Sequence, residues 1–137
     1  MTLSIQLKQT LQTRLRPFVA LSFILVGILH FTHASIFVGI MPPYLPWHLE
    51  LVWISGVFEI LGGLGLLIPP VRRFSSWGLL ALLVAVFPAN LHMAVNGVFI
   101  DVPIPQSQLG LWLRLPLQLV IAAQVWFVGL YQITSKV

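Results

Sequence analysis

A small set of ionisable and amide side chains interrupts the apolar stretches of this sequence. They are His30, Glu59, Asn90, Arg114 and Gln118. An ionisable side chain inside a membrane-spanning helix costs about 2.5 to 3.5 kcal/mol on insertion scales, so most spans avoid one. Groups that are kept there pair with one another or take part in function. We therefore expect these five side chains to form one interior ligand-binding site.

Helical spacing adds two secondary candidates to this site. Ser55 precedes Glu59 by four residues and His33 follows His30 by three, so the members of each pair lie near one another on a helix surface. Small residues continue the faces of His30 and Glu59, and such stripes are where membrane helices approach each other closely. Both faces are therefore expected to point into the protein.

His92, Tyr44 and His48 are further secondary candidates. His92 lies on the helix face next to that of Asn90, and either face could line the interior, although we favour Asn90. Tyr44 and His48 belong to the segment 41–48, which contains three prolines. This stiff segment could lie over the outer mouth of the pocket as a lid, or it could be a plain connector.

Arg114 carries the charge that is hardest to remove, and inside a membrane it is expected to pair with a carboxylate. Glu59 lies about 8 Å deeper by the helical rise, whereas Glu50 lies at a similar depth but closer to solvent. The sequence leaves both pairings open. In one interpretation the ion pair only orients the bundle. In the other, Glu59, His30 and Arg114 hold a polar ligand or pass a proton.

The polar site could hold a quinone or a lipid, because both combine an apolar body with a polar head. Haem b would need axial histidines on facing helices, and His30, His33 and His92 are the candidates. Histidines in spans are more often hydrogen-bonded structural partners, so haem is disfavoured. A metal site built from His30, His33 and a carboxylate is weaker still, and we expect no metal.

The composition indicates what kind of protein positions these groups. Hydrophobic residues make up 58% and charged residues 7% of the chain, and the mean hydropathy is +0.99. A water-soluble domain carries about a quarter charged residues. We predict an all-α integral membrane four-helix bundle, because four stretches are long enough to cross a bilayer. The predicted spans are 17–40, 48–68, 74–96 and 109–131, in a single domain of residues 17–137 that follows a short amphipathic helix or flexible segment over 1–16.

The basic residues outside the predicted spans indicate an orientation. They are Lys8, Arg14, Arg16, Arg72, Arg73 and Lys136. Because such residues are retained on the cytoplasmic side, both termini are expected to be cytoplasmic and the polar site to lie in the outer half. The net charge is +4, but the scattered basic residues form no dense face for nucleic acid. We expect a multi-pass protein of the bacterial plasma membrane.

Short motifs are spread over nearly the whole chain. They include Gly27-x-x-His30-Phe31, Met41-Pro42-Pro43-x-x-Pro46, Ser55-Gly56-x-x-Glu59-Ile60, Ala89-Asn90-x-x-Met93 and Arg114-Leu115-Pro116-x-Gln118. Together they resemble the DoxX-like family of small four-helix membrane proteins. The resemblance implies a four-helix bundle with an interior site around His30, Glu59, Asn90 and Arg114.

The same resemblance implies that the protein has partner proteins, but it does not imply a particular reaction. The family takes its name from a membrane subunit of a thiosulfate:quinone oxidoreductase, and relatives are described as partners of redox enzymes or as assembly factors for other membrane proteins. The chain contains no cysteine, which argues against the thiol-based role of related disulfide-handling bundles. We expect a redox-enzyme or other membrane-protein partner, in addition to the lipid bilayer.

Three functions are compatible with these observations. The first, which we favour, is a non-catalytic membrane subunit or binding module whose polar pocket holds a quinone-like or lipid-like ligand. The second is a membrane subunit of a quinone-linked oxidoreductase, with His30 and Glu59 as proton donors. The third is a proton or small-solute pathway. It would need a homo-oligomer, because four spans leave only a narrow interior.

Overall fold

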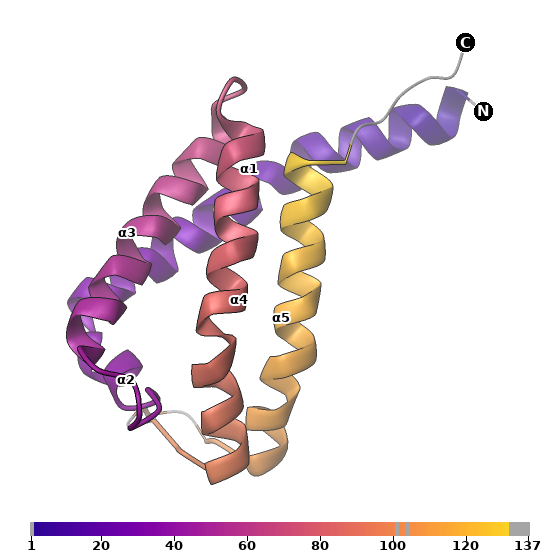
Figure 1. Ribbon diagram of the computed structural model, residues 1–137. Helices are drawn as coiled ribbons and strands as arrows, with labels where there is room; N and C mark the ends of the chain where they lie inside the picture. The colour runs from indigo at the N-terminus through magenta and orange to yellow at the C-terminus, as the bar shows by residue number, and fades with distance from the viewer. Residues whose placement is uncertain (1, 101, 104, 132–137) are drawn as a thin grey trace.

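The computed structural model describes residues 2–100, 102–103 and 105–131. Five α-helices and no strand make up this part of the chain, which confirms the predicted all-α class. The four long helices fit a four-helix bundle (Figure 1). The helices are α1 (Thr2–Thr32), α2 (Ala34–Val38), α3 (His48–Leu67), α4 (Arg72–Asn96) and α5 (Gln108–Gly129).

The four long helices have the length and apolar character that a membrane span needs. Many of their large apolar side chains lie on the outside of the bundle: Phe18 is 70% exposed, Phe74 84% and Leu119 71%. A water-soluble protein rarely exposes a continuous apolar surface of this kind, whereas acyl chains cover it in a bilayer. The architecture is therefore that of a multi-pass membrane protein.

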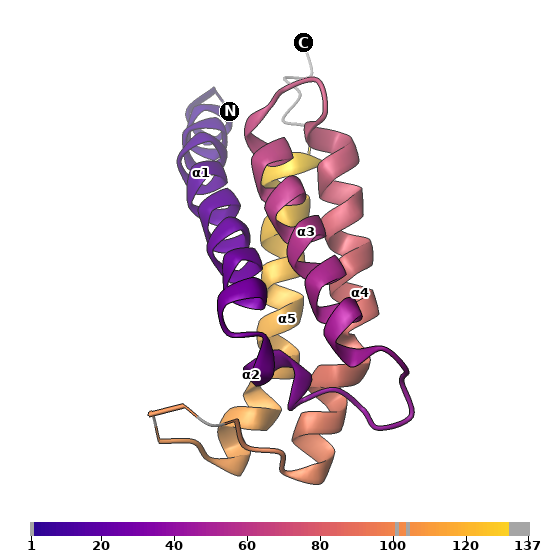
Figure 2. The same cartoon turned by 90° about the vertical axis from the view of Figure 1, so that its left-hand side faces the viewer.

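The first helix begins earlier than the sequence predicted. Pro17 was expected to start the span, but it lies inside α1, so that prediction is wrong. Proline is tolerated there because side chains and neighbouring helices can satisfy the backbone groups that it frees. The 31 residues of α1 span about 46 Å, more than the thickness of about 30 Å of the hydrocarbon layer. Its first turns reach past the rest of the bundle (Figure 1), and Figure 2 shows α1 along one side of the bundle.

Polar side chains of α1 fasten it to the end of α5. The amide nitrogen of Gln12 donates to the carbonyl oxygens of Phe127 (2.6 Å) and Tyr131 (3.0 Å), and Nε of Arg16 donates to the carbonyl oxygen of Val128 (3.1 Å). The last carbonyl groups of a helix have no partner within the helix. These bonds therefore cap α5 and hold residues 2–16 in helical continuity with the first span.

The first span also ends earlier than expected, at Thr32 instead of residue 40. His33 leaves the helical conformation (φ −132°, ψ 42°), and the chain then forms the separate short helix α2. The bounds of α3, α4 and α5 differ from the predicted spans 48–68, 74–96 and 109–131 by at most two residues. Gly97 ends α4 with a φ of 62°, a left-handed conformation that glycine adopts readily at the end of a helix.

Glycines bring α1 and α3 into close contact. A Cβ atom on Gly56 would lie 2.9 Å from the carbonyl oxygen of Gly27, and one on Gly63 would lie 2.7 Å from that of Ala20. Both distances are too short for a real side chain, so the two backbones approach as closely as they do only because Cβ is absent. Small residues play the same role at many interfaces between membrane helices.

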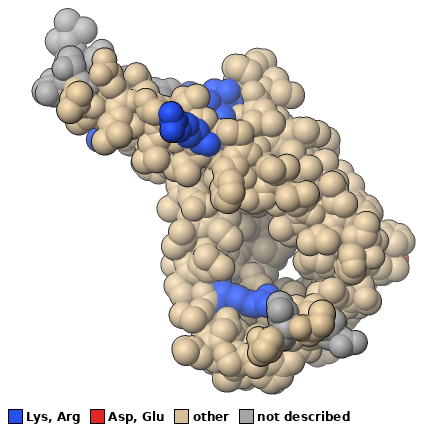
Figure 3. Space-filling model, turned by 180° about the vertical axis from the view of Figure 1, so that it is seen from behind, with Lys and Arg blue, Asp and Glu red and all other residues tan. Residues whose placement is uncertain are grey.

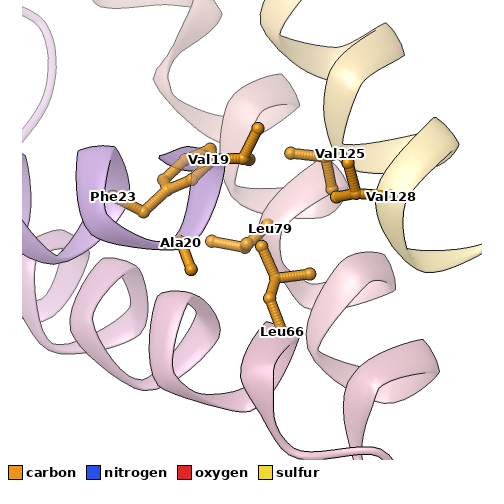
Figure 4. Packing of buried hydrophobic residues seen from close by; sticks show 7 residues of the cluster. All are labelled: Val19, Ala20, Phe23, Leu66, Leu79, Val125 and Val128. Carbon is orange, nitrogen blue, oxygen red and sulfur yellow. The ribbon is translucent and has the colours of Figure 1, made fainter. Parts of the chain in front are cut away.

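A packed core holds all four long helices together at one end of the bundle. We call this end, where residues 68–71 join α3 to α4, the upper end. The core is an apolar cluster of buried residues, shown in Figure 4, and the buried side chain of Ser76 lies beside it. Its members are Val19, Ala20, Phe23, Leu66, Leu79, Val125 and Val128.

Below this core the bundle divides into two pairs of helices. α1 packs mainly against α3, and α4 packs against α5. The pairs separate towards the lower end, where α2 lies (Figure 1). A second, smaller cluster of Met93, Ala94 and Leu111 joins α4 to α5 at that end, with Ile40 packed against it. The site described next lies between the two clusters.

Candidate functional site

A cavity of about 550 Å³ lies between the two pairs of helices. All five helices contribute to its wall, and so does the connection after α2, through Met41 and Leu45. Seen from behind, the lower half of the molecule is hollowed, with a basic patch at the rim of the hollow (Figure 3). The cavity size falls within the range of about 300 to 1,000 Å³ that is typical of small-molecule sites.

The structure brings the five primary candidates from the sequence to this one cavity, together with one secondary candidate. Their side chains come from α1, α3, α4 and α5 and lie among mostly apolar residues. This convergence follows from the antiparallel arrangement, because residues far apart in the sequence reach the same depth in neighbouring helices. The six residues are His30, Ser55, Glu59, Asn90, Arg114 and Gln118.

His30 and Glu59 are two ionisable residues of the cavity that lie within ion-pair distance of each other. Nδ1 of His30 lies 3.2 Å from Oε2 of Glu59 and 2.9 Å from the carbonyl oxygen of Val26. A carbonyl oxygen can only accept, so Nδ1 carries the proton and donates to Val26. Oε2 of Glu59 is buried and accepts no well-aligned hydrogen bond. The carboxylate therefore faces the imidazole across a short distance but stays incompletely satisfied.

One face of the His30 ring is covered by Phe37 of α2. The rings of His30 and Phe37 stack with their centroids 3.8 Å apart and an angle of 21° between their planes. This contact depends on the break at His33, which turns α2 out of the axis of α1. The break therefore fixes the orientation of the imidazole at the cavity wall.

Amide side chains link α4 to α5 on the opposite wall. Nδ2 of Asn90 donates to Oε1 of Gln118 (3.1 Å), and Nε2 of Gln118 donates to the carbonyl oxygen of Leu83. Pro88 lies inside α4, where it cannot donate to the preceding turn and loosens the hydrogen bonding of that part of the helix. Gln118 is buried. Its amide bonds to the side chain of Asn90 and to the carbonyl oxygen of Leu83, two polar groups of α4.

Arg114 lines the same cavity but pairs with neither expected carboxylate. Among the residues that the structure describes, it has no ion pair and no hydrogen bond, so the predicted pairing with Glu59 or Glu50 is wrong. The arrangement of the helices explains this: α3 packs against α1 and α4 and lies diagonally across from α5. Glu59 meets His30 instead, and Glu50 is exposed at the start of α3.

Two of the secondary candidates, His33 and His48, lie outside the cavity, each with a local partner. Nδ1 of His33 is 2.8 Å from the hydroxyl oxygen of Thr32, and the side chain is exposed. Nε2 of His48 donates to the carbonyl oxygen of Pro42 (3.0 Å), which fastens the connection before α3. Such contacts are structural, and they do not bring His33 or His48 to His30.

His92 and Tyr44 also lie away from the cavity. Nδ2 of Asn96 donates to Nδ1 of His92 (3.0 Å) and to its carbonyl oxygen (3.0 Å). Both His92 and Tyr44 border a small depression of about 220 Å³ beside α4. The face of α4 that lines the main cavity is therefore that of Asn90, which we had favoured over the face of His92.

The sequence did not single out several residues that the structure places at the cavity. Ser22 and Gln124 line it, and Ser22 could have been found from its spacing of eight residues from His30, two turns along one face. Gln124 is a polar residue in an apolar span, which is itself a signal. Phe37 could not have been found, because its position depends on the break between α1 and α2.

Comparison with known proteins identifies a family but no function. The family described as "Domain of unknown function (DUF8561)" matches residues 19–129, which include all of the polar cavity residues. No curated protein and no solved structure matches the chain.

Proposed function

We propose that this chain, which belongs to the DUF8561 family, is a membrane-embedded binding module that holds an amphipathic ligand in the cavity between its helix pairs. The observation that carries this proposal is the convergence of eight polar side chains from four helices on one mostly apolar cavity. Ligand sites have this composition, because apolar walls bind the body of the ligand and a few polar groups orient its head. A quinone-like or a lipid-like molecule would fit.

The surroundings of the cavity support a binding role. The polar side chains of the cavity lie below the upper core, where the α1–α3 pair separates from the α4–α5 pair. A tightly packed, mostly apolar core closes the upper half, which argues against a continuous proton or solute pathway through a single copy. We propose that the module is non-catalytic on its own and serves a redox enzyme or another membrane protein as a subunit.

We also propose the orientation and membrane that the basic residues favour. The described basic residues outside the cavity lie on the first half of α1 or at the start of α4, at the upper end of the bundle (Figure 3). This end would be cytoplasmic, with both termini on that side, in the plasma membrane of a bacterium. The cavity would then lie in the outer half. Kinship with the DoxX-like family is part of the same proposal and rests on the motifs around the cavity residues.

Co-purification tests the binding function. The protein is purified in a mild neutral detergent, and native mass spectrometry counts bound molecules, which organic extraction then identifies. We expect about one amphiphile per chain. Ser55→Leu should reduce this occupancy several-fold, because the larger side chain fills part of the cavity. Val84→Leu is the matched control, since Val84 is 74% exposed on the outside of α4. Equal occupancy in both variants, or none in the wild type, would contradict the proposal.

The His30–Glu59 pair favours one alternative, a membrane subunit of a quinone-linked oxidoreductase. A histidine and a carboxyl group 3.2 Å apart could deliver protons to a quinone that receives electrons from a partner protein. The identity of the co-purified molecule distinguishes this alternative from lipid binding. A quinone that exchanges with added quinone would favour it, and a phospholipid or fatty acid would exclude it.

A further inference from the structure

We infer that the head group of the ligand is an anion bound by Arg114, and that the ligand enters from the bilayer between α1 and α5. This inference rests on the proposed binding function and names the chemical class of the ligand. It depends on two observations: the balance of charges in the cavity and the side on which the cavity is open.

Arg114 leaves the cavity with an uncompensated positive charge. Three ionisable side chains line the cavity: His30, Glu59 and Arg114. Glu59 lies 3.2 Å from His30, which compensates its charge when the imidazole is protonated, whereas Arg114 has no partner among the described residues. Glu50 is exposed outside the cavity, and Asp101, the third acidic residue of the chain, lies outside the described residues.

The chemistry of the guanidinium group determines the complementary ligand. Arginine keeps its charge in any protein environment, and its planar set of N–H donors matches a carboxylate or a phosphate. A charge in an apolar cavity is costly unless it is paired. The carbonyl oxygen of a neutral quinone would accept a hydrogen bond but would leave the charge in place. An anionic head therefore gains more from Arg114 than a neutral one does.

The amide groups of the same wall do not compensate the charge of Arg114. The amide nitrogen of Asn90 donates to Gln118 and that of Gln118 donates to the carbonyl oxygen of Leu83, and a neutral amide carries no charge that could balance a guanidinium. These bonds hold the wall of α4 and α5 in place. The guanidinium of Arg114 is consequently the one ionic donor group that the described cavity residues leave free for a ligand.

The open side of the cavity lies between α1 and α5. The hydrogen bonds and buried core contacts that join these helices lie in the upper half, from Gln12 to Phe23 on α1. Further down, Val26 of α1 and Leu117 of α5 both line the cavity and are 39% and 54% exposed. The hollow in Figure 3 lies on this side. Apolar, partly exposed rims suit the acyl chain of a ligand that enters from the lipid.

Binding of matched amphiphiles tests the inference. Delipidated protein in dodecyl maltoside is titrated by calorimetry with oleate, with oleyl alcohol, which has the same chain and no charge, and with short-chain phosphatidylglycerol and phosphatidylcholine. We expect the anionic member of each pair to bind about tenfold more tightly or better, since hydrogen bonds to a charged group are stronger than neutral ones. The tighter of oleate and phosphatidylglycerol identifies the source of the anion, a free fatty acid or a phospholipid.

Variants at basic positions assign the effect to Arg114. Arg114→Gln should abolish the preference for the anion, and Arg114→Lys should restore part of it. Arg73→Gln makes the same change of charge at an exposed position outside the cavity and should leave the preference intact. Equal affinity for anionic and neutral amphiphiles in the wild type would overturn the inference while the proposed function stands. No binding of any of the four would overturn both. The comparison of anionic with neutral amphiphiles in the wild-type protein tests the inference even if a variant does not fold.

Discussion

Nδ1 of His30 lies between two oxygen acceptors, the carbonyl of Val26 at 2.9 Å and Oε2 of Glu59 at 3.2 Å. One N–H group cannot align well with both, and the carbonyl takes the better position. Glu59 is left as a buried carboxylate that depends on the nearby imidazole for most of its compensation. This asymmetry makes the two residues unequal contributors to stability.

We predict that His30→Phe destabilises the protein more than Glu59→Gln does. Phenylalanine keeps the ring that stacks on Phe37 but leaves Glu59 buried without a partner, which should cost about 3 kcal/mol. Glu59→Gln removes the charge and keeps an acceptor near the imidazole, so its cost should be about 1 kcal/mol or less. Unfolding in mixed detergent micelles, followed by circular dichroism, measures both values.

The double variant provides the control for this pair. Adding Glu59→Gln to His30→Phe should recover stability, because the neutral amide no longer needs the imidazole. If the two single effects simply add, the residues do not interact and the pairing described here is wrong. If Glu59→Gln folds normally but loses the co-purified amphiphile, Glu59 does more than orient the bundle.

The contact between α1 and α3 predicts opposite effects for two glycine substitutions. Gly63→Ala should destabilise the protein by about 1 to 3 kcal/mol, because the new Cβ would lie 2.7 Å from a backbone oxygen of α1. Gly78→Ala is the matched control: nothing lies within 4 Å of its Cβ, so helix propensity should make it neutral or more stable by up to about 1 kcal/mol. Similar melting curves for the two variants would contradict the close approach.

The amide link between α4 and α5 predicts a difference between two glutamines on one helix. Gln118→Leu removes the donor to Leu83 and the acceptor for Asn90, which should cost about 1 kcal/mol or more. Gln124→Leu makes the same change at an exposed position for which the structure shows no hydrogen bond, and we expect almost no loss. Thermal unfolding of both variants tests this, and a larger loss for Gln124→Leu would refute it.

The proposed orientation is testable because the chain contains no cysteine. Tyr44 and Arg73 are both exposed, at opposite ends of the bundle. In intact cells, a membrane-impermeant maleimide should label Tyr44→Cys directly and Arg73→Cys only after the membrane is permeabilised. The reverse pattern would place the polar cavity in the inner half of the membrane.

Much of the fold could be predicted from the sequence, because hydropathy and helix length limit what a bilayer accepts. The common depth of His30, Glu59 and Gln118 in the membrane could also be predicted, because consecutive spans run antiparallel. The break at His33 could not be predicted, since neither proline nor glycine marks it and the packing of Phe37 on His30 accompanies it. The helical continuity of α1 through Pro17 was missed for a similar reason: the contacts to α5 that hold it are distant in the sequence.

The pairing of side chains was harder to predict than their location. Arg114 and Glu59 lie in the same cavity, and charge alone suggests a bond between them. The order of the helices prevents this bond. Glu59 on α3 contacts His30 of the neighbouring helix α1, whereas Arg114 stands on α5, diagonally across from α3. The order of helices around a bundle depends on small-residue contacts such as that of Gly27 with Gly56, whose partners a single sequence does not identify.

An experimental structure of the protein, purified with its native lipids, tests the central claim most directly. We expect an elongated density in the cavity between α1 and α5, with its head beside Arg114 and its tail along the apolar wall towards Phe23. The contradicting result is a lower half in which α1 and α5 pack against each other and leave no cavity, with lipid density confined to the outside of the bundle.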